Sequence, residues 1–375
     1  MSIYETLGVR RVINAAAAQT KLGGSLMPPP VLAAMEDAAG SFIDLPELHD
    51  RVGERIAALT RNEAACVSCG AAAGILQAVA ACITGADPAR ITALPDVADC
   101  PRHEVVYFRG QWNGFLSAAR ETGATLVEVG ETEDELVNAV TERTAAVIWF
   151  ASSLFEPFAP PLERIVAIAH ERDVPVIVDA ANQTPPVANL WYFTTEVGAD
   201  LAIFSGGKGL RGPQSSGLIL GRRDLIASCR ANGGPFHSVG RPAKVGKEEL
   251  VGVLAAVEWS LALDEPDVLA GYDAIVRRWV DGLGALPGVS AERIPESHTG
   301  QPIPRAVLHA GDGARRDALI ESLWQHDPRI AVLPEGEDGI AFNPQLLEPG
   351  EADVVLAALR AVVTEAAPVA VPVGH

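Results

Sequence analysis

Two side chains with complementary chemistry follow apolar segments of the chain. Residues 176–178 are apolar and end in Asp179, and residues 201–204 lead through a Ser-Gly-Gly turn to Lys208. Because ligands of open α/β sheets bind at the carboxyl ends of strands, we expect both side chains at one sheet edge. A lysine there can form a Schiff base with an aldehyde cofactor, and an aspartate can keep a pyridinium nitrogen protonated. The pair indicates pyridoxal 5'-phosphate (PLP), although two such residues can also be solvated strand ends.

A small-residue turn offers a place for the cofactor phosphate. Residues 67–74 read VSCGAAAG and run into a predicted helix over 75–82, so backbone N–H groups around Gly70 and Ala71 can bind an anion. Ser205, just before Lys208, is a further candidate contact. The alternative is that the small residues only allow close helix packing.

Two other motifs in these segments are set aside. Residues 207–212 match G-x-G-x-x-G, but Pro213 follows and residues 216–220 read as a strand, so the segment does not open a nucleotide-binding helix. Gly209 directly after Lys208 excludes a P-loop. Cys66-x-x-Cys69 has no second cysteine pair, so we expect structural thiols and no metal site.

A third cluster is basic. The three cations Arg241, Lys244 and Lys247 lie within one stretch of seven residues, and the chain as a whole is acidic. Their functional interpretation is an anion site for the cofactor phosphate or a substrate carboxylate, with Arg241 suited to a bidentate contact. Arg211, three residues after Lys208, is another candidate of this kind. The alternative for the 241–247 segment is a solvated loop that leads into a helix.

The elements that must position these residues predict an α/β fold. Apolar segments over 105–108, 126–129, 146–150, 174–179 and 201–204 alternate with helical patterns, which is typical of a mostly parallel sheet covered on both faces. After residue 221 long helices dominate, with a predicted break near Glu265-Pro266 and a few short strands, one of them over 330–333. We predict an N-terminal segment over 1–40, a large cofactor domain over 41–262 and a small α+β domain over 263–375.

Composition limits the partners. The 375 residues carry 29 Lys and Arg against 48 Asp and Glu, a net charge of −19, which is unfavourable for binding nucleic acid or an anionic membrane surface. No apolar segment approaches the roughly 18 residues of a membrane span. Five cysteines without framework spacing and the absence of a signal-peptide pattern predict a cytoplasmic protein.

Taken together, the motifs resemble the selenocysteine synthase (L-seryl-tRNA selenium transferase) superfamily of fold type I PLP enzymes, and within it the branch of D-glucosaminate-6-phosphate ammonia-lyase. The resemblance covers nearly the whole chain. It is carried by the ordered segments 12–16 (VINAA), 22–25 (LGGS), 178–181 (VDAA), 204–209 (FSGGKG), 212–217 (GPQSSG) and 240–247 (GRPAKVGK).

The resemblance implies a role for each matching residue. Lys208 matches the Schiff-base lysine and Asp179 the partner of the pyridinium nitrogen. Ser205 and the Gly70-Ala71 turn match the phosphate site, while Arg241 and Lys244 match an active-site loop. It also implies a homodimer or higher homo-oligomer with shared active sites. Because the sequence begins at the segment that resembles the catalytic core, we expect no tRNA function.

The chain departs from its relatives at two places. Ala17-Ala18 stands where the family usually has Gly-Thr, and Arg109-Gly110-Gln111-Trp112 stands where the lyase branch has an R-G-H segment. The second change removes a candidate acid/base histidine. Gln111 becomes a candidate cofactor contact, and Trp112 a candidate ring to stack on the cofactor or to cap the surface.

The predicted function is therefore that of a PLP-dependent enzyme acting at Cα of a small amino acid or amino sugar acid. We predict α,β-elimination that yields a 2-oxo acid and ammonia, with Lys208 removing the Cα proton. Racemase and aminotransferase activities share this first step and stay open. A non-catalytic binding subunit is a further alternative, which the presence of both Lys208 and Asp179 disfavours.

Overall fold

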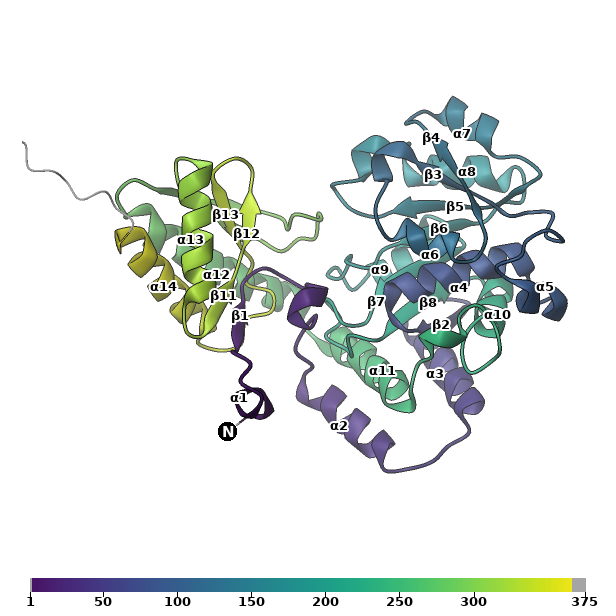
Figure 1. Cartoon of the computed structure of the whole chain (residues 1–375), viewed down its shortest axis with the longest axis horizontal. Coiled ribbons are helices and arrows are strands. Elements are labelled where there is room, and N and C mark those ends of the chain that lie inside the picture. Colours follow the sequence, from purple (N-terminus) through teal and green to yellow (C-terminus); the bar gives the residue numbers. More distant parts are fainter. Residues whose placement is uncertain (1, 366–375) are drawn as a thin grey trace, which may run out of the picture. The chain divides into compact units, whose positions relative to one another are not determined.

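The computed structural model describes residues 2–365, which fold into two compact units (Figure 1). The large unit contains Gly24–Leu263 and His298–Gly300. The small unit contains the described parts of Met1–Gly23, Asp264–Ser297 and Gln301–His375. The domain boundaries predicted at residues 40 and 262 remain predictions.

The large unit is built on a seven-stranded sheet of order β2-β8-β7-β6-β5-β3-β4. β2 and β7 both pair antiparallel with β8, and β7 continues through parallel pairs to β6, β5, β3 and β4. All strands except β8 therefore end at the same edge, here called the carboxyl edge. The strands are β2 (Ala64–Ser68), β3 (Glu104–Phe108), β4 (Thr125–Val129), β5 (Thr144–Phe150), β6 (Val176–Asp179), β7 (Leu201–Ser205) and β8 (Gly217–Gly221).

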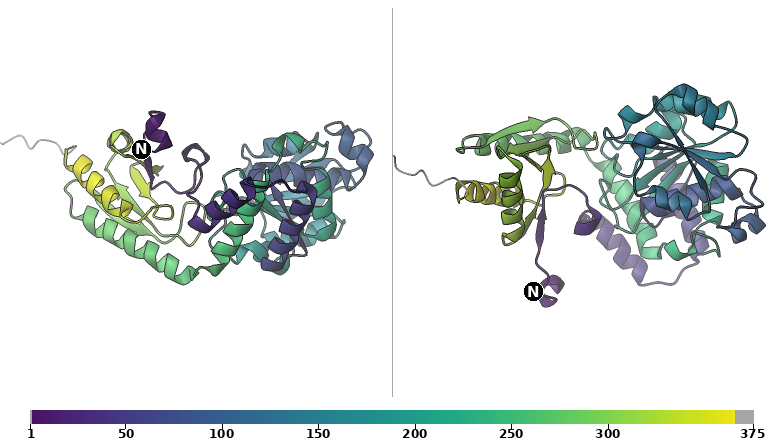
Figure 2. Two further views of the ribbon diagram at one scale, coloured as in Figure 1. Left: turned by 90° about the horizontal axis from the view of Figure 1, so that it is seen from below. Right: turned by 45° about the horizontal axis from the view of Figure 1, so that its top comes forward.

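Helices cover both faces of this sheet, as the two views of Figure 2 show. Along β5, Val147 and Trp149 pack into one core and Ile148 and Phe150 into the other, so alternate side chains serve the two faces. The Trp149 face receives α3 (Leu45–Leu59), α7 (Glu133–Ala139), α8 (Leu162–His170), α9 (Asn189–Trp191) and α11 (Lys247–Ala262). The Phe150 face receives α4 (Gly70–Thr84), α6 (Leu116–Arg120) and α10 (Arg223–Ala231).

Shorter elements complete the large unit. α2 packs along α11. A π-helical segment follows α9 directly. These elements are α2 (Pro29–Ala39), α5 (Pro88–Ala93), η2 (Arg109–Gln111), η3 (Glu156–Phe158), η4 (Tyr192–Glu196) and η5 (Arg241–Ala243).

The small unit has its own core around a four-stranded antiparallel sheet of order β12-β13-β10-β9. Buried Trp279 and Phe342 pack edge to face in that core. The chain's first strand pairs in parallel with β11, which ties the N-terminal segment to this unit. The elements are α1 (Ile3–Thr6), β1 (Val12–Asn14), η1 (Thr20–Leu22), α12 (Glu265–Gly284), β9 (Ser290–Ile294), β10 (Arg305–His309), α13 (Gly313–Gln325), β11 (Arg329–Ala331), β12 (Leu333–Glu335), β13 (Gly339–Phe342) and α14 (Glu351–Glu365).

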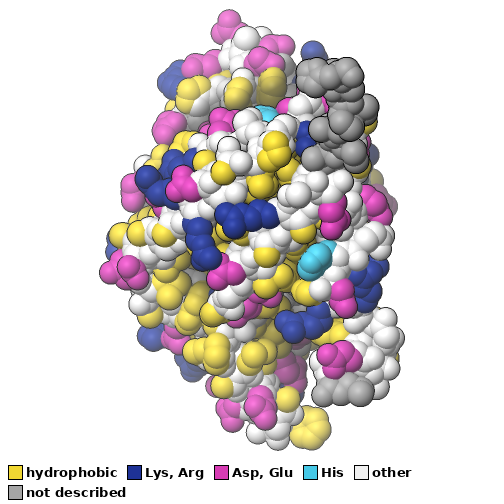
Figure 3. All heavy atoms as spheres, turned by 90° about the vertical axis from the view of Figure 1, so that its left-hand side faces the viewer, with side chains coloured by type: hydrophobic (Ala, Val, Ile, Leu, Met, Phe, Trp, Pro, Cys, Tyr) yellow, Lys and Arg dark blue, Asp and Glu magenta, His cyan; other side chains and the backbone are white. Residues whose placement is uncertain are grey.

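The predicted α/β class and mostly parallel sheet are confirmed. The predicted helix break falls between α11 and α12, where Asp264 caps the N-terminus of α12. The predicted strand over 330–333 is instead two short strands in different sheets, with Val332 between them. Acidic, basic and apolar side chains are interspersed on the face drawn in Figure 3. Among residues 2–365, no helix is long and apolar enough to cross a membrane.

Candidate active site

Strand register brings the predicted site residues to the carboxyl edge. Asp179 pairs with Phe150 on one side and with Ile203 on the other. Further along, Ser68 and Ser205 both pair with Gly217, so two hydroxyl-bearing residues flank a glycine in one row. Asp179 and Ser205 therefore end the neighbouring strands β6 and β7, and Lys208 follows β7 by three residues.

Asp179 is a buried carboxylate. Its Oδ1 accepts a hydrogen bond of 2.9 Å from the backbone N–H of Ala181. Burial raises the pKa of Asp179, and the Ala181 N–H and the nearby Lys208 charge oppose that rise. A carboxylate held this way is suited to a cationic N–H partner, such as a protonated pyridine nitrogen.

Lys208 is half-buried on the compact turn that follows β7. Burial lowers the pKa of its ammonium group, while Asp179 opposes that change. The turn is closed by hydrogen bonds from Gly206 N to Ser216 O (2.8 Å) and from Gly212 N to Gly206 O (2.7 Å). A methyl group at Gly209 would lie 1.9 Å from the carbonyl oxygen of Thr184, so only glycine fits there. The lysine is thereby held on a rigid turn within the electrostatic reach of Asp179.

The small-residue turn at the start of α4 forms a cradle beside this pair. Gly70 has φ +80°, and Ser68 Oγ donates to its carbonyl oxygen at 2.9 Å. A methyl group at Gly217 would come within 2.7 Å of the Gly70 carbonyl carbon, so the glycine lets β8 approach the turn closely. The free N–H groups of the first turn of α4 make this a fitting place for a phosphate. Ala71 lies in that turn and is half-buried.

The two candidates after β3 are held by other parts of the protein. Gln111 is fully buried; its Oε1 accepts from Phe150 N at 2.9 Å and its Nε2 donates to Phe155 O at 3.3 Å. These contacts favour a structural role, because both ends of the amide bind backbone. Trp112 is 49% exposed and its ring packs against Tyr107 and under the Arg120 guanidinium. Cofactor contact by either residue remains a prediction.

The basic candidates lie in two places. Arg211 Nε donates to Leu26 O at 2.7 Å, and its guanidinium lies over the Trp259 ring. Arg241 is half-buried on η5, and Lys244 is exposed one residue beyond that turn. The loop before η5 is closed by a hydrogen bond from Gly240 N to Asn232 O at 3.1 Å. A joint anion site for these side chains remains a prediction.

A group of contacts that no sequence motif predicted lies at the same edge. Asn182 Nδ2 donates to Thr299 Oγ1 at 2.9 Å, and Gln183 Nε2 donates to Thr299 O at 3.0 Å. The partners are more than 110 positions apart in the sequence, and no local sequence pattern predicts the contact. Only the position of Asn182 and Gln183, just beyond Asp179, could have pointed to the site.

Comparison with known proteins gives consistent matches. The family model described as L-seryl-tRNA selenium transferase (SelA) matches residues 19–261. The chain is 37% identical to the 5'-C-glycyluridine monooxygenase-decarboxylase of Streptomyces sp, over 94% of this chain and 90% of that protein.

It is also 35% identical to the D-glucosaminate-6-phosphate ammonia lyase of Salmonella typhimurium, over 98% of this chain and 99% of that protein. A solved structure of D-glucosaminate-6-phosphate ammonia-lyase superposes with a TM-score of 0.85 at 29% identity, covering 98% of this chain and 100% of the solved chain. The resemblance seen in the sequence motifs is confirmed by these matches.

Proposed function

Because this chain belongs to the L-seryl-tRNA selenium transferase (SelA) family, we propose that it is a lyase that releases ammonia from an amino acid bearing a β-hydroxyl group. The protein is a PLP-dependent enzyme of fold type I. The observation that carries the site assignment is the meeting of Asp179, Lys208 and the Gly70 cradle at one sheet edge.

The residues present fit PLP at each of its reactive parts. Lys208 would bind the aldehyde carbon, and Asp179 would hold the ring nitrogen. The first turn of α4, with Gly70 and Ala71, and the hydroxyl of Ser205 would hold the phosphate. When bound, the cofactor supplies an electron sink that stabilises negative charge at the substrate Cα.

This chain's own residues then have defined tasks. The amine of Lys208 takes the Cα proton, and its burial favours this because the lowered pKa increases the neutral fraction. Asp179 keeps the pyridine nitrogen protonated through charge and a hydrogen bond. Loss of the β-hydroxyl as water and hydrolysis of the resulting enamine give a 2-oxo acid and ammonia.

The substrate class follows from a relative and from the basic loop. The S. typhimurium relative is named for D-glucosaminate 6-phosphate, an amino acid with a hydroxyl at Cβ and an anionic group at the far end. Arg241 and Lys244 are the cations that we assign to such an anion. We therefore propose a hydroxylated, anionic amino acid as substrate.

A second copy of the chain completes the proposal. Exposed apolar side chains lie before, on and after α2: Leu26 (56% exposed), Leu32 (50%), Phe42 (103%) and Ile43 (48%). Such a group on a folded surface is typical of a protein interface. We propose that the cytoplasmic enzyme is a homo-oligomer and that this surface meets the partner subunit.

A second candidate function comes from the other relative. At 37% identity, the Streptomyces protein is named a monooxygenase-decarboxylase, a reaction that removes the α-carboxyl carbon and consumes O₂. Gln111 stands where the lyase branch has a histidine, and this departure leaves room for a reaction other than elimination. The two candidates differ in products and in their need for O₂.

One experiment separates them. PLP-loaded protein is incubated with D-glucosaminate 6-phosphate, D-serine, L-serine and 5'-C-glycyluridine, in air and under argon. Ammonia and a 2-oxo acid formed equally in both atmospheres support the lyase. An amide and CO₂ formed only in air would support the second candidate and contradict the first.

A further inference from the structure

The tripeptide His298–Gly300 belongs to the large unit, although the residues on both sides of it belong to the small unit. It lies in the connection between β9 and β10. Its neighbours in the large unit are residues that follow the carboxyl ends of β5 and β6. No sequence motif predicts a role for this connection.

Thr299 anchors the tripeptide by contacts to three residues. Its carbonyl oxygen accepts from Gln183 Nε2 at 3.0 Å and from Ser153 N at 3.4 Å, and its Oγ1 accepts from Asn182 Nδ2 at 2.9 Å. Gln183 is itself buried, with a second bond of 2.8 Å from Nε2 to Ala151 O. The anchor is therefore attached to the core of the sheet rather than to a flexible surface.

Close packing fixes the next residue as well. Gly300 has φ +86°, and a methyl group there would lie 3.0 Å from Ser153 Cβ. His298, on the other side of Thr299, is half-buried. Its Cα lies about 3.8 Å from that of Thr299, as for any adjacent pair of residues. The backbone of residue 298 is thus held next to the contact between Thr299 and Asn182, which lies three positions after Asp179.

The proposed elimination needs such a group. Lys208 removes the Cα proton, but a β-hydroxyl leaves poorly as hydroxide and needs a proton of its own. Gln111 is neutral and has both ends of its amide bound to backbone, so it does not supply this proton. His298 is a histidine that the fold brings to the carboxyl edge.

We propose that His298 is the catalytic acid that protonates the departing β-hydroxyl, and that Thr299 is the residue that positions it. This inference rests on the proposed lyase function. In the step, the Cβ–O bond breaks and its electron pair stays on oxygen, which takes the imidazolium proton and leaves as water. The electron pair released at Cα forms the Cα–Cβ double bond, and the neutral imidazole regains its proton from solvent.

The first test compares His298→Gln with His103→Gln, a half-buried histidine at the start of β3, away from the carboxyl edge. With D-glucosaminate 6-phosphate in D₂O, we expect His298→Gln to release ammonia about 10²- to 10⁴-fold more slowly. Deuterium should still enter at Cα, because Lys208 is intact, and the PLP absorbance should be unchanged. His103→Gln should match the wild type.

The second test removes the need for the acid. Chloride leaves 3-chloroalanine without a proton, so His298→Gln should release ammonia from this substrate at close to the wild-type rate. If His298→Gln loses as much activity on the chloride substrate as on the hydroxyl substrate, the proposed role of His298 is wrong. The same holds if the variant loses Cα deuterium exchange together with ammonia release. Both results would leave the proposed lyase function standing. A wild type that releases ammonia from neither substrate would overturn the proposed function and this step with it.

Two further variants test the positioning role of Thr299. Thr299→Ser keeps the oxygen that accepts from Asn182, whereas Thr299→Val removes it. We expect the serine variant to retain activity and the valine variant to lose about tenfold in kcat on the hydroxyl substrate, with KM nearly unchanged. Equal activity of the two variants would contradict the positioning role. So would a Thr299→Val defect that is as large with 3-chloroalanine as with the hydroxyl substrate.

Discussion

The two edges of the large sheet each hold a buried aspartate, and the two carboxylates differ in the donors that the protein supplies to them. At the carboxyl edge, Asp179 has a backbone N–H from Ala181 and the field of Lys208 as its main favourable interactions. At the opposite edge, Asp200 stands just before β7 and is bound by three donors. Both carboxylates are almost fully removed from solvent.

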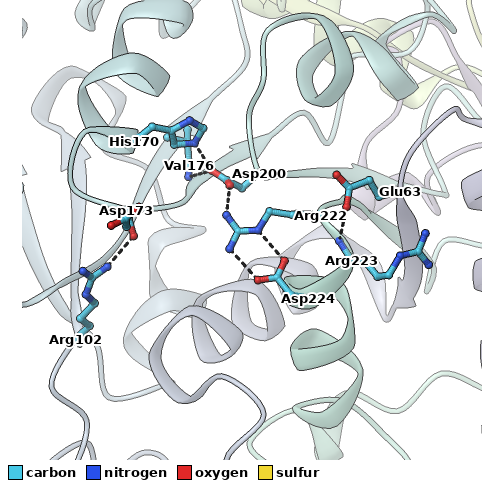
Figure 4. A network of polar contacts seen from close by, with 9 residues as sticks. All are labelled: Glu63, Arg102, His170, Asp173, Val176, Asp200, Arg222, Arg223 and Asp224. Carbon is cyan, nitrogen blue, oxygen red and sulfur yellow. Dashed lines mark hydrogen bonds and ion pairs between the residues drawn. The ribbon is translucent and has the colours of Figure 1, made fainter.

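Figure 4 shows the Asp200 network. Oδ2 accepts from Val176 N at 2.7 Å and contacts His170 Nε2 at 2.9 Å, and Oδ1 accepts from Arg222 Nη1 at 2.6 Å. Arg222 also binds Asp224 through Nε and Nη2. A cavity of about 620 Å³ opens beside this network. The network is satisfied from within the protein.

The difference separates scaffold from site. A buried carboxylate whose oxygens are filled by protein donors stabilises the fold, because each donor offsets the cost of burial. A buried carboxylate that keeps capacity for another donor is costly in the empty protein and useful once a cationic ligand arrives. This criterion supports the proposal that the carboxyl edge is the functional one, although a cavity of about 620 Å³ lies at the other edge.

The largest effect is expected at Lys208. Lys208→Ala should lower ammonia release by at least about 10⁴-fold, because it removes both the covalent anchor and the base. Lys208→Arg should be equally inactive, since arginine keeps its charge and cannot serve as a base. Visible absorbance after PLP addition measures whether the cofactor still binds covalently, and a thermal melt measures whether the variant keeps its stability. A fully active arginine variant would contradict the assignment.

The next effect concerns the opposite edge. Asp200→Asn should lower the free energy of unfolding by roughly 1 to 3 kcal/mol, because a buried neutral amide replaces the carboxylate that accepts from Val176, His170 and Arg222. Urea unfolding followed by circular dichroism measures the loss. The folded variant should still bind PLP and retain its activity per folded molecule. A stable variant that has lost PLP binding would reverse the roles given to the two edges.

A smaller effect is expected from pH. Burial raises the pKa of Asp179, so the folded apoprotein keeps a proton that the unfolded chain has already lost. The stability contributed by this group is therefore present at low pH. It is lost as the pH rises above roughly 4, the ordinary aspartate value, through the higher folded-state pKa.

Asp179→Asn should remove that loss, so the variant's apoprotein should be less sensitive to pH over this range than the wild type. Addition of PLP should stabilise the wild type more than the variant, because the carboxylate then gains its cationic partner. Melting temperatures from pH 4 to 8, with and without PLP, measure both effects. Identical pH profiles of the two apoproteins would argue against a raised pKa at Asp179.

Sequence reasoning was most reliable for features that local pattern determines. Continuous apolar segments predicted the parallel strands, and the ends of two of these segments predicted that Asp179 and Lys208 lie at one edge; Asp179 ends β6, and Lys208 follows the neighbouring β7. The Asp200 network could not be foreseen, because its partners come from three separate segments: the end of α8, the start of β6 and the residue that follows β8. Thr299 was missed for the same reason. Gln111 was proposed as a ligand contact because sequence alone does not show that backbone groups occupy both ends of its amide.

The smallest effect tests how tightly the carboxyl edge is built. Gly217→Ala adds a methyl group 2.7 Å from the Gly70 carbonyl carbon and 2.8 Å from Ser68 Oγ, so the turn at the start of α4 must shift. Shifts of this kind cost roughly 1 to 3 kcal/mol. Since the turn forms the proposed phosphate cradle, part of that cost should appear as an approximately tenfold weaker PLP affinity, measured by fluorescence titration.

Gly271→Ala is the control, because a methyl group there meets no atom within 4 Å and lies within helix α12. It should leave PLP affinity unchanged and raise stability by about 0.5 to 1 kcal/mol. Unchanged PLP affinity in Gly217→Ala would place the phosphate away from the row formed by Ser68, Gly217 and Ser205, and would confine the site to Asp179 and Lys208.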